Sequence, residues 1–252
     1  DSVTLFVAEG KISTELAATL AQDGVRLQAY SAAHAQLAQV KGSILIDPRR
    51  ITLGTRQAIH ASCSVVEAIN PSVFLKSQKS SKEAEFVRQA MVQDGIALCE
   101  FFTWLEQAQG KERITELTID EKINAARARR NDFVCHSFGT IAGFNANGAM
   151  PHYHATPESH AVIEGDGLLL IDSGGQYLNG TTDITRMVAI GTLSPEQKRD
   201  VTLVLRAMIA LSVMKFPQGT RSPVLDTTAR AVIWSAGANY GHGTGHGVGY
   251  FM

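Results

Sequence analysis

Residues 167–191 read GLLLIDSGGQYLNGTTDITRMVAIG, and no other stretch of the chain carries a stronger signal for its fold. Four apolar residues run into Asp172, which is typical of a strand, and Asn179-Gly180 is a strong signal for a hairpin turn. The periodicity of strands and turns extends over residues 133–191. This part of the chain is therefore expected to form an antiparallel sheet.

The turn determines which residues of the hairpin face each other. A two-residue turn at Asn179-Gly180 places Gln176 opposite Asp183, and Asp172 has the same parity as Gln176, so both aspartates face one side. On a flat ribbon they would still lie ~13 Å apart. That is too far to share two metal ions ~3.5 to 4 Å apart. We therefore expect a bend or bulge at residues 173–175, Ser-Gly-Gly.

Taken alone, the two aspartates have a structural interpretation that is about as well supported. Asp172 would be a turn residue at the end of a strand, and Asp183 a hydrogen-bonded loop carboxylate.

Helical patterns lie on both sides of the sheet. Apolar residues at helical spacing follow capping signals such as Ser80 with Glu83, Thr118 with Glu121, and Ser194 with Gln197. The expected helices cover residues 80–109, about 118–130, 194–214 and 225–235. The second part of the chain is thus α+β, with helices flanking an antiparallel sheet.

The first 70 residues form a different kind of module. Short β-branched runs alternate there with helical patterns, which is typical of an α/β arrangement. Strands are expected at residues 3–8, 25–30 and 44–47, and helices at 14–21 and 32–40. The polar residues 70–81 are expected to be a linker. We place the domain boundary between residues 1–76 and 77–252.

Composition excludes several classes of protein. Of the 252 residues, 44% are hydrophobic and 19% charged, which excludes low-hydrophobicity disorder. No apolar run approaches the ~18 to 20 residues of a membrane helix, so no membrane partner is expected. With 23 basic and 24 acidic side chains, no overall field attracts a polyanion, and no nucleic-acid partner is expected.

The chain also has a local basic cluster and three cysteines. Arg127, Arg129 and Arg130 fit the C-terminus of a helix better than a nucleic-acid patch. The cysteines are odd in number and lack CxxC spacing, which favours reduced, mostly buried thiols over a redox site; they are Cys63, Cys99 and Cys135. The first residues, DSVTLF, carry no basic signal-peptide region. A cytoplasmic location is expected.

Two further segments contribute histidines. Residues 240–250, YGHGTGHGVGY, contain His242 and His246, and their glycines argue against a helix and against a dinucleotide loop. A cavity wall close to a ligand and an exposed loop are the alternatives. Upstream lies His152 in residues 147–154. His154 and His160, which follow it, are interpreted as ordinary loop histidines. Two aspartates with a histidine suit Mn²⁺ or Co²⁺ as well as Zn²⁺.

The order of these motifs resembles that of the pita-bread metallopeptidases, and specifically the Xaa-Pro aminopeptidases. PHYH at 151–154, LIDSGGQYLNGTTDITR at 170–186 and HGTGHGVG at 242–249 carry the resemblance. FPQGT, LDTTAR and the long helical segment after the linker follow the family's order, so the similarity covers essentially the whole chain. It implies a pita-bread catalytic domain preceded by part of a creatinase-type α/β middle domain that is not catalytic.

The resemblance also implies roles for five residues. Asp172, Asp183 and His246 would be metal ligands, with Asp183 as the bridge. His152 and His242 would be catalytic histidines that contact substrate. The implied cofactor is two divalent ions, with Mn²⁺ expected and Zn²⁺ or Co²⁺ as alternatives. Two such ions lower the pKa of a bridging water, and an imidazole can donate to the tetrahedral intermediate.

The implied activity is that of a hydrolase that releases the N-terminal residue from peptides with proline in second position. The bond to proline has no N–H, so general exopeptidases fit it poorly. A homodimer is expected. A prolidase-type dipeptidase and a catalytically silent binding module are the alternatives. The five residues together argue against the silent module, and the module before the linker favours the aminopeptidase.

The family has two glutamates and a further histidine downstream of HGTGHGVG, and the sequence ends at Met252. We therefore expect the C-terminal segment of the domain to be absent, and these residues alone to bind metal weakly or singly without turnover.

Overall fold

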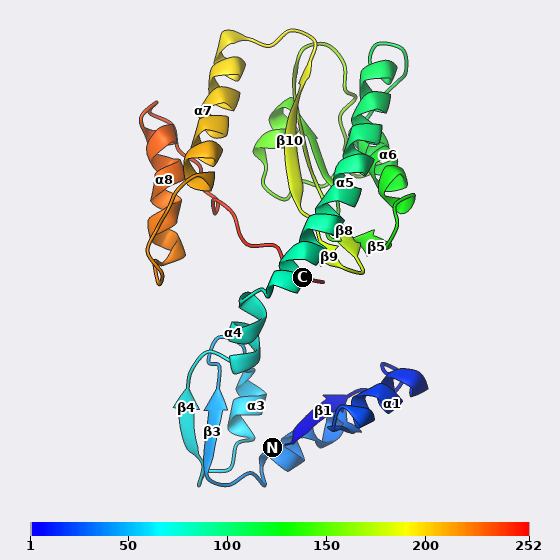
Figure 1. Ribbon diagram of the computed structural model, residues 1–252. Helices are drawn as coiled ribbons and strands as arrows, with labels where there is room; N and C mark the ends of the chain where they lie inside the picture. The colour runs from blue at the N-terminus through cyan, green and yellow to red at the C-terminus, as the bar shows by residue number, and fades with distance from the viewer. Residues whose placement is uncertain (1, 252) are drawn as a thin grey trace. The chain divides into compact units, whose positions relative to one another are not determined.

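The computed structural model describes residues 2–251 (Figure 1). Contacts divide the chain into two compact units, Asp1–Gln78 and Lys79–Met252. Among the helices of residues 2–251, none combines the length and apolar character that a bilayer crossing requires.

The first unit is α/β. It holds two parallel strand pairs, β1 (Val3–Val7) with β2 (Val25–Ala29) and β3 (Ser43–Ile46) with β4 (Ser64–Glu67). Its helices are α1 (Thr14–Gln22), η1 (Tyr30–Ala32), α2 (Ala33–Leu37), α3 (Leu53–Gln57) and α4 (Pro71–Ser77). Parallel pairing requires a crossover between the strands, and the helices supply it. The predicted alternation of strands and helices is confirmed.

The segment expected to be a linker is largely helical. The side chain of Asn70 accepts a hydrogen bond from Ser72 N at 2.9 Å, and Pro71 lies in the first turn of α4. The prediction was wrong because Asn-Pro, which also opens loops, here acts as an N-cap followed by a proline at the first helical position.

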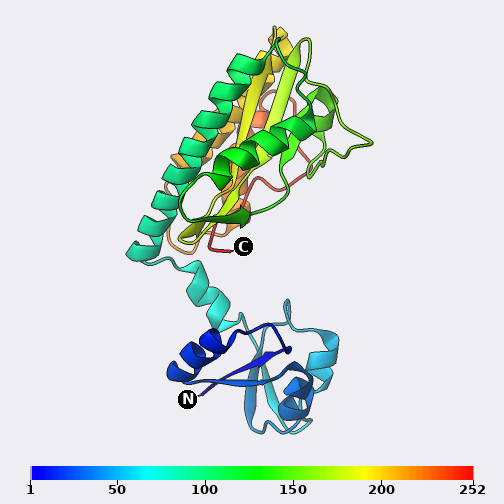
Figure 2. The ribbon, with the colours of Figure 1, turned by 90° about the vertical axis from the view of Figure 1, so that its right-hand side faces the viewer.

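Four long helices define the second unit. They are α5 (Ser81–Ala108), α6 (Glu116–Ala128), α7 (Pro195–Ser212) and α8 (Ser222–Trp234). The capping boxes at Ser80 and Ser194 are confirmed. The predicted start of α6 was wrong: Thr115 and Thr118 form its capping box, three residues before the expected one. Figure 2 shows α5 and α6 beside the strands.

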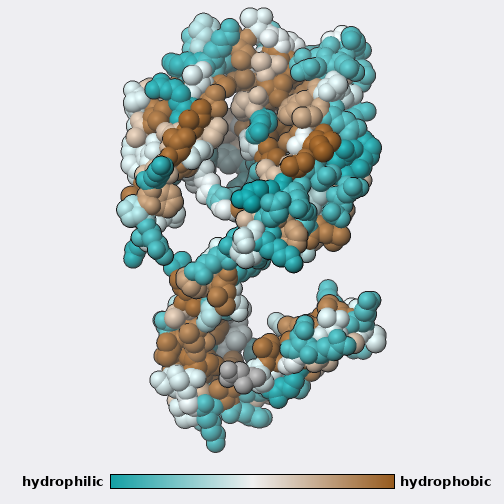
Figure 3. Space-filling view, viewed as in Figure 1, coloured by the Kyte–Doolittle hydropathy of each residue, from teal (hydrophilic) through white to brown (hydrophobic). Residues whose placement is uncertain are grey.

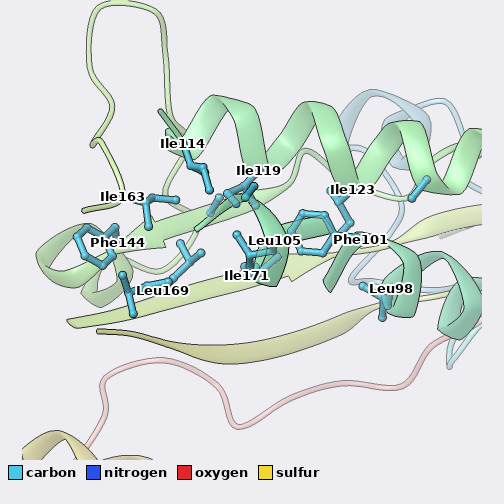
Figure 4. Packing of buried hydrophobic residues seen from close by; sticks show 14 of the residues in the cluster. Leu98, Phe101, Leu105, Ile114, Ile119, Ile123, Phe144, Ile163, Leu169 and Ile171 are labelled. Carbon is cyan, nitrogen blue, oxygen red and sulfur yellow. The ribbon is translucent and has the colours of Figure 1, made fainter. Parts of the chain in front are cut away.

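Six strands form two antiparallel sheets of three. One has the order β10 (Ile184–Ile190), β7 (Gly167–Ser173), β6 (Ile141–Phe144), and the other β5 (Phe133–His136), β8 (Gly175–Tyr177), β9 (Gly180–Thr181). Buried and partly exposed residues alternate along β7, so one face of this strand lies inward. Leu169 and Ile171 on that face pack with Phe101 and Leu105 of α5 (Figure 4). This core fixes the strand that carries Asp172.

The cysteines are more exposed than predicted. All three cysteines are free thiols, but Cys99 and Cys135 are exposed and only Cys63 is partly buried. Cys99 lies on the solvent side of α5 and Cys135 on an edge strand, so the apolar character of a thiol does not determine its burial there.

The basic cluster lies at the end of α6, as predicted. Arg127 is fully buried and pairs with Asp94 of α5 at 2.7 Å, while Arg129 and Arg130 pair with Glu100. These ion pairs with α5 occupy all three side chains.

Candidate metal centre

A sheet change at Gly174 brings the two predicted aspartate ligands together. β7 ends at Ser173 and pairs with β6 and β10, whereas β8 begins at Gly175 and pairs with β5 and β9. A Cβ at position 174 would overlap the carbonyl oxygen of Thr182, the residue before Asp183. Only glycine fits so close an approach. The predicted bend at residues 173–175 is confirmed.

The predicted hairpin register was wrong by one step. Gln176 pairs with Thr181 and Tyr177 with Gly180, so the turn residues are Leu178 and Asn179 instead of Asn179-Gly180. A Cβ at Gly180 would lie 3.2 Å from Cβ of Ala90 on α5, so Gly180 is a strand residue pressed against this helix.

As a consequence, Gln176 does not face Asp183. Asp172 pairs with Thr185, and Asp183 lies between β9 and β10, beside the pair Ile184–Ser173. The aspartates meet at the junction of the two sheets.

The two carboxylates crowd each other. Burial raises the pKa of Asp183, the negative charge of Asp172 raises it further, and the nearby His246 acts in the opposite direction. Oδ1 of Asp172 is buried and has no hydrogen-bond partner among the described residues. Buried carboxylate oxygens without donors are costly, and a cation between two such groups would satisfy both.

His246 approaches the same aspartate from another part of the chain. Its Nε2 lies 3.4 Å from Oδ2 of Asp183, and its Nδ1 lies 3.0 Å from the carbonyl oxygen of Gly247. A proton on Nδ1 donated to that carbonyl leaves the lone pair of Nε2 available to a metal. The donor set therefore fits a divalent cation in chemistry.

The contacts are pairwise. Asp183 touches both Asp172 and His246, but across residues 2–251 no group of three histidine, cysteine, aspartate or glutamate side chains converges closely enough to enclose a metal ion. Asp183 is thus the shared member of two pairs, one with Asp172 and one with His246.

Two adjoining cavities open at these residues. One, of about 380 Å³, is lined by Asp172, Asp183, His246, His152 and His154. The other, of about 520 Å³, shares Asp172, His246 and His152 and adds His242. Both volumes lie in the range of small-ligand sites.

His154 is a site residue that the sequence analysis set aside. It lines the first cavity, with its ring against Gly139, where a Cβ would lie 3.3 Å from the imidazole. The H-x-H spacing of His152 and His154 gave no usable signal, because His152 has a φ of 60° and the segment is not an extended strand. His160, by contrast, is a loop histidine whose Nδ1 lies 2.9 Å from the carbonyl of Thr156.

The loop that bears His242 and His246, residues 240–249, contains no helix or strand, as its glycines predict. Arg230 of α8 donates to the carbonyls of Tyr240 and His242 at 2.9 and 2.8 Å. The hydroxyl of Thr244 donates to Asp226, one turn before Arg230. The loop is thus attached to α8 on its N-terminal side.

The C-terminal side of this loop is attached to β9. Thr181 N donates to the carbonyl of Gly249 at 3.2 Å, and the segment runs from α8 back toward β9 (Figure 1, red). Residues 240–249 thereby bring His246 to the junction that holds Asp183.

Comparison with known proteins identifies the family. Residues 85–252 match Metallopeptidase family M24, and residues 1–83 match the Creatinase/Prolidase N-terminal domain. The chain belongs to the M24 metallopeptidase family, and a creatinase-type domain precedes its pita-bread domain. The resemblance and the α+β fold class predicted from the sequence are confirmed.

Several relatives match over the whole chain. A probable Xaa-Pro aminopeptidase P of Botryotinia fuckeliana and Xaa-Pro aminopeptidase 1 of Dictyostelium discoideum are both 36% identical; the matches cover 100% of this chain and 40% and 41% of those proteins. The chain thus spans about two fifths of the length of the curated relatives it matches.

Solved structures agree with this assignment. The X-prolyl aminopeptidase of Caenorhabditis elegans, described as a cytosolic enzyme with a di-nuclear active site, has a TM-score of 0.90 at 28% identity, over 100% of this chain and 42% of that one. A prolidase of Pyrococcus horikoshii has a TM-score of 0.76 at 24% identity, over 99% and 70%, which shows the shared fold.

Proposed function

We propose that this chain carries the core of a metal-dependent exopeptidase that releases the N-terminal residue from peptides with proline in second position. The observation that carries the proposal is the position of Asp183, which contacts both Asp172 and His246 at the wall of a cavity. The names of the relatives that match the whole chain support the substrate class.

In this proposal Asp172, Asp183 and His246 would hold divalent metal, with Asp183 as the shared ligand. The di-nuclear site described for the Caenorhabditis elegans relative supports a pair of ions. Mn²⁺ is the proposed metal, with Zn²⁺ and Co²⁺ as alternatives that the same donors accept. When bound, such a pair supplies a hydroxide nucleophile near neutral pH and polarises the scissile carbonyl.

His152 and His242 act on the substrate. Both line the second cavity together with Asp172 and His246, so a peptide bond held beside the ligands lies within their reach. A positioned imidazole N–H can donate to the carbonyl oxygen as negative charge develops on it. We assign that role to His152, and assign His242 to contact with the substrate in the same cavity.

The proposal assigns different roles to the two domains. Residues 77–252 carry the catalytic chemistry, and residues 1–76 belong to a non-catalytic α/β domain. Every predicted site residue lies in the second of the two compact units, which supports this division.

Partners and location follow from the same proposal. The partners are peptide substrates and a second copy of the protein. No nucleic-acid partner is proposed, and the basic cluster of Arg127, Arg129 and Arg130 is engaged in ion pairs with Asp94 and Glu100. A cytoplasmic location is supported by the description of the Caenorhabditis elegans relative as cytosolic.

The test measures release of arginine from an Arg-Pro-Pro peptide by the full-length protein with added Mn²⁺. Hydrolysis should require the metal and vanish in Asp183→Asn, which removes the shared ligand while keeping the side-chain shape. Undiminished hydrolysis in that variant would refute the role of Asp183. Cleavage of Arg-Pro but not of Arg-Pro-Pro would instead identify a prolidase-type dipeptidase.

A further inference from the structure

The loop between β6 and β7 holds His152 in an unusual backbone conformation. Its φ is 60°, in the left-handed region that residues other than glycine rarely adopt. Such a conformation persists only where the surrounding structure fixes it. The residues that fix this loop therefore bear on where the His152 imidazole lies.

A single buried carboxylate ties the loop together. Glu116, at the start of α6, is fully buried. It accepts hydrogen bonds from Phe144 N and Ala161 N, both at 2.7 Å, from the amide of Asn147 at 3.0 Å and from the hydroxyl of Tyr153 at 2.8 Å. All four groups are donors, and an ionised carboxylate is the side chain that accepts from all of them.

These donors are distributed along the whole loop. Phe144 is the last residue of β6, Ala161 lies near the end of the loop, and Asn147 lies in the short helix η2 (Asn145–Ala149). Tyr153 is the immediate neighbour of His152. One side chain thus anchors both ends of the loop and the residue next to the strained histidine.

The Tyr153 hydroxyl keeps the proton that it donates to Glu116. Burial, together with the hydrogen bond and charge of Glu116, raises the pKa of Tyr153 to about 12. The phenol therefore stays protonated and donates to Glu116 over the pH range in which a peptidase works.

We propose that Glu116 is a positioning residue for His152, which holds Tyr153 and the loop ends so that the His152 imidazole stays at the cavity wall beside Asp172. The inference rests on the proposed function for the meaning of that position. It predicts that loss of Glu116 acts through His152 and leaves the metal ligands unchanged, because Glu116 contacts none of them.

A double-mutant cycle in the full-length protein tests this. Glu116→Gln should lower kcat/KM for the Arg-Pro-Pro peptide with Mn²⁺ by roughly 10- to 100-fold, since small displacements of a catalytic group have effects of that order. In the His152→Ala background, the same change should cost no more than about 3-fold, because coupled residues do not add. An equally large loss in both backgrounds would overturn the proposal.

Asp94→Asn is the matched control. Asp94 is also fully buried and accepts hydrogen bonds, from Arg127 and Tyr177, but it contacts no residue of the loop. Whatever Asp94→Asn costs in the wild-type background, it should cost the same with His152→Ala. Coupling of His152 to Asp94 as strong as to Glu116 would show a general loss of structure and contradict a specific role.

Tyr153→Phe covers the case in which Glu116→Gln does not fold. It removes a single donor from the carboxylate and should lower kcat/KM in the same direction, again only when His152 is present. The Mn²⁺ dissociation constant, measured by calorimetry, should stay within about 3-fold of wild type. A large change in metal affinity would overturn the proposal.

A spectroscopic readout separates this inference from the proposed function. The His152 imidazole signals, assigned by their loss in His152→Ala, should shift in ¹⁵N-histidine NMR spectra of Tyr153→Phe and stay in place in Asp94→Asn. If the wild-type protein cleaves no Xaa-Pro peptide, the proposed function fails, and these spectra still test the position of His152. Unshifted His152 signals in Tyr153→Phe would refute the positioning role.

Discussion

Asp172 and Asp183 lie in a region that is packed from several sides, whereas His246 lies on an exposed glycine-rich loop. Ser173 and Thr182, which flank the aspartates, are fully buried, and Gly174 admits no side chain. The His246 side chain is 66% exposed, against 26% for Asp183. The two parts of one candidate site thus differ in how firmly the fold holds them.

The two regions are held in place by different kinds of contact. The aspartate region, residues 172–183, is held by the junction of two sheets. It is also held by the buried ion pair of Asp94 and Arg127, which Tyr177 of β8 contacts. The histidine loop, residues 240–249, is held by a few hydrogen bonds to α8 and β9.

The buried support of the aspartate region gives the largest expected effect. Asp94 binds Arg127 through two hydrogen bonds and accepts a third from Tyr177 on β8, and all three side chains are fully buried. Asp94→Ala leaves an unpaired buried charge and should lower the free energy of unfolding by about 3–5 kcal/mol in urea titrations.

Glu100→Ala is the control for that variant. Glu100 also lies on α5 and pairs with arginines of the α6 end, but its side chain is 43% exposed. Its loss should cost under about 1 kcal/mol. Equal losses of unfolding free energy in the two variants would show that the ion pair of Asp94 and Arg127 does not support the aspartate region.

Gly174 and Gly247 allow a second comparison of packing in the aspartate region and in the histidine loop, with a smaller expected effect. In Gly174→Ala the new methyl group meets the Thr182 carbonyl and Ser137, so the backbone next to Asp183 must move. We expect a loss of about 2–3 kcal/mol in the free energy of unfolding, with weaker Mn²⁺ binding. In Gly247→Ala the methyl group meets open space, and stability should stay within about 0.5 kcal/mol of wild type. A comparable loss in both would contradict the difference in packing.

The smallest expected effect is a pH response of the histidine loop. Hydrogen bonds from Thr244 and then from Arg230 lower the pKa of Asp226 below its ordinary value of 3.8. A group with a lowered pKa stabilises the folded loop above its ordinary pKa, and this contribution is lost as the pH falls through the lowered value. Amide exchange of residues 240–249 should therefore show protection at pH 5 that declines as the pH falls from about 3.8 through the lowered pKa.

Asp226→Asn is the control for this response. The amide keeps the shape of the side chain but does not titrate, so the change in protection between pH 5 and pH 3 should disappear. The same pH-dependent change in Asp226→Asn would show that another group controls the loop.

The sequence predicted those features that follow from local patterns. Capping boxes at Ser80 and Ser194 and the bend at residues 173–175 depend on neighbouring residues, and they are found where expected. The hairpin register was missed because Gly180, a typical turn residue, is pressed against Ala90 on a helix ninety residues upstream.

The supports of the site could not be predicted, because they join distant residues. Glu116 meets Tyr153 37 positions away, and Asp94 meets Tyr177 83 positions away. Neither pair leaves a periodic signal. Likewise, an isolated His154 resembles any loop histidine until the fold places Gly139 and the cavity around it.

Mn²⁺ binding by Asp183→Asn is the most direct test of the candidate metal centre, because Asp183 is the residue that joins the two regions. Calorimetric titration of the full-length protein should show saturable binding in the wild type. In Asp183→Asn, the affinity should fall by at least about 10-fold, the size of effect expected when even a supporting group of a metal site is removed. Unchanged stoichiometry and affinity in that variant would contradict the account.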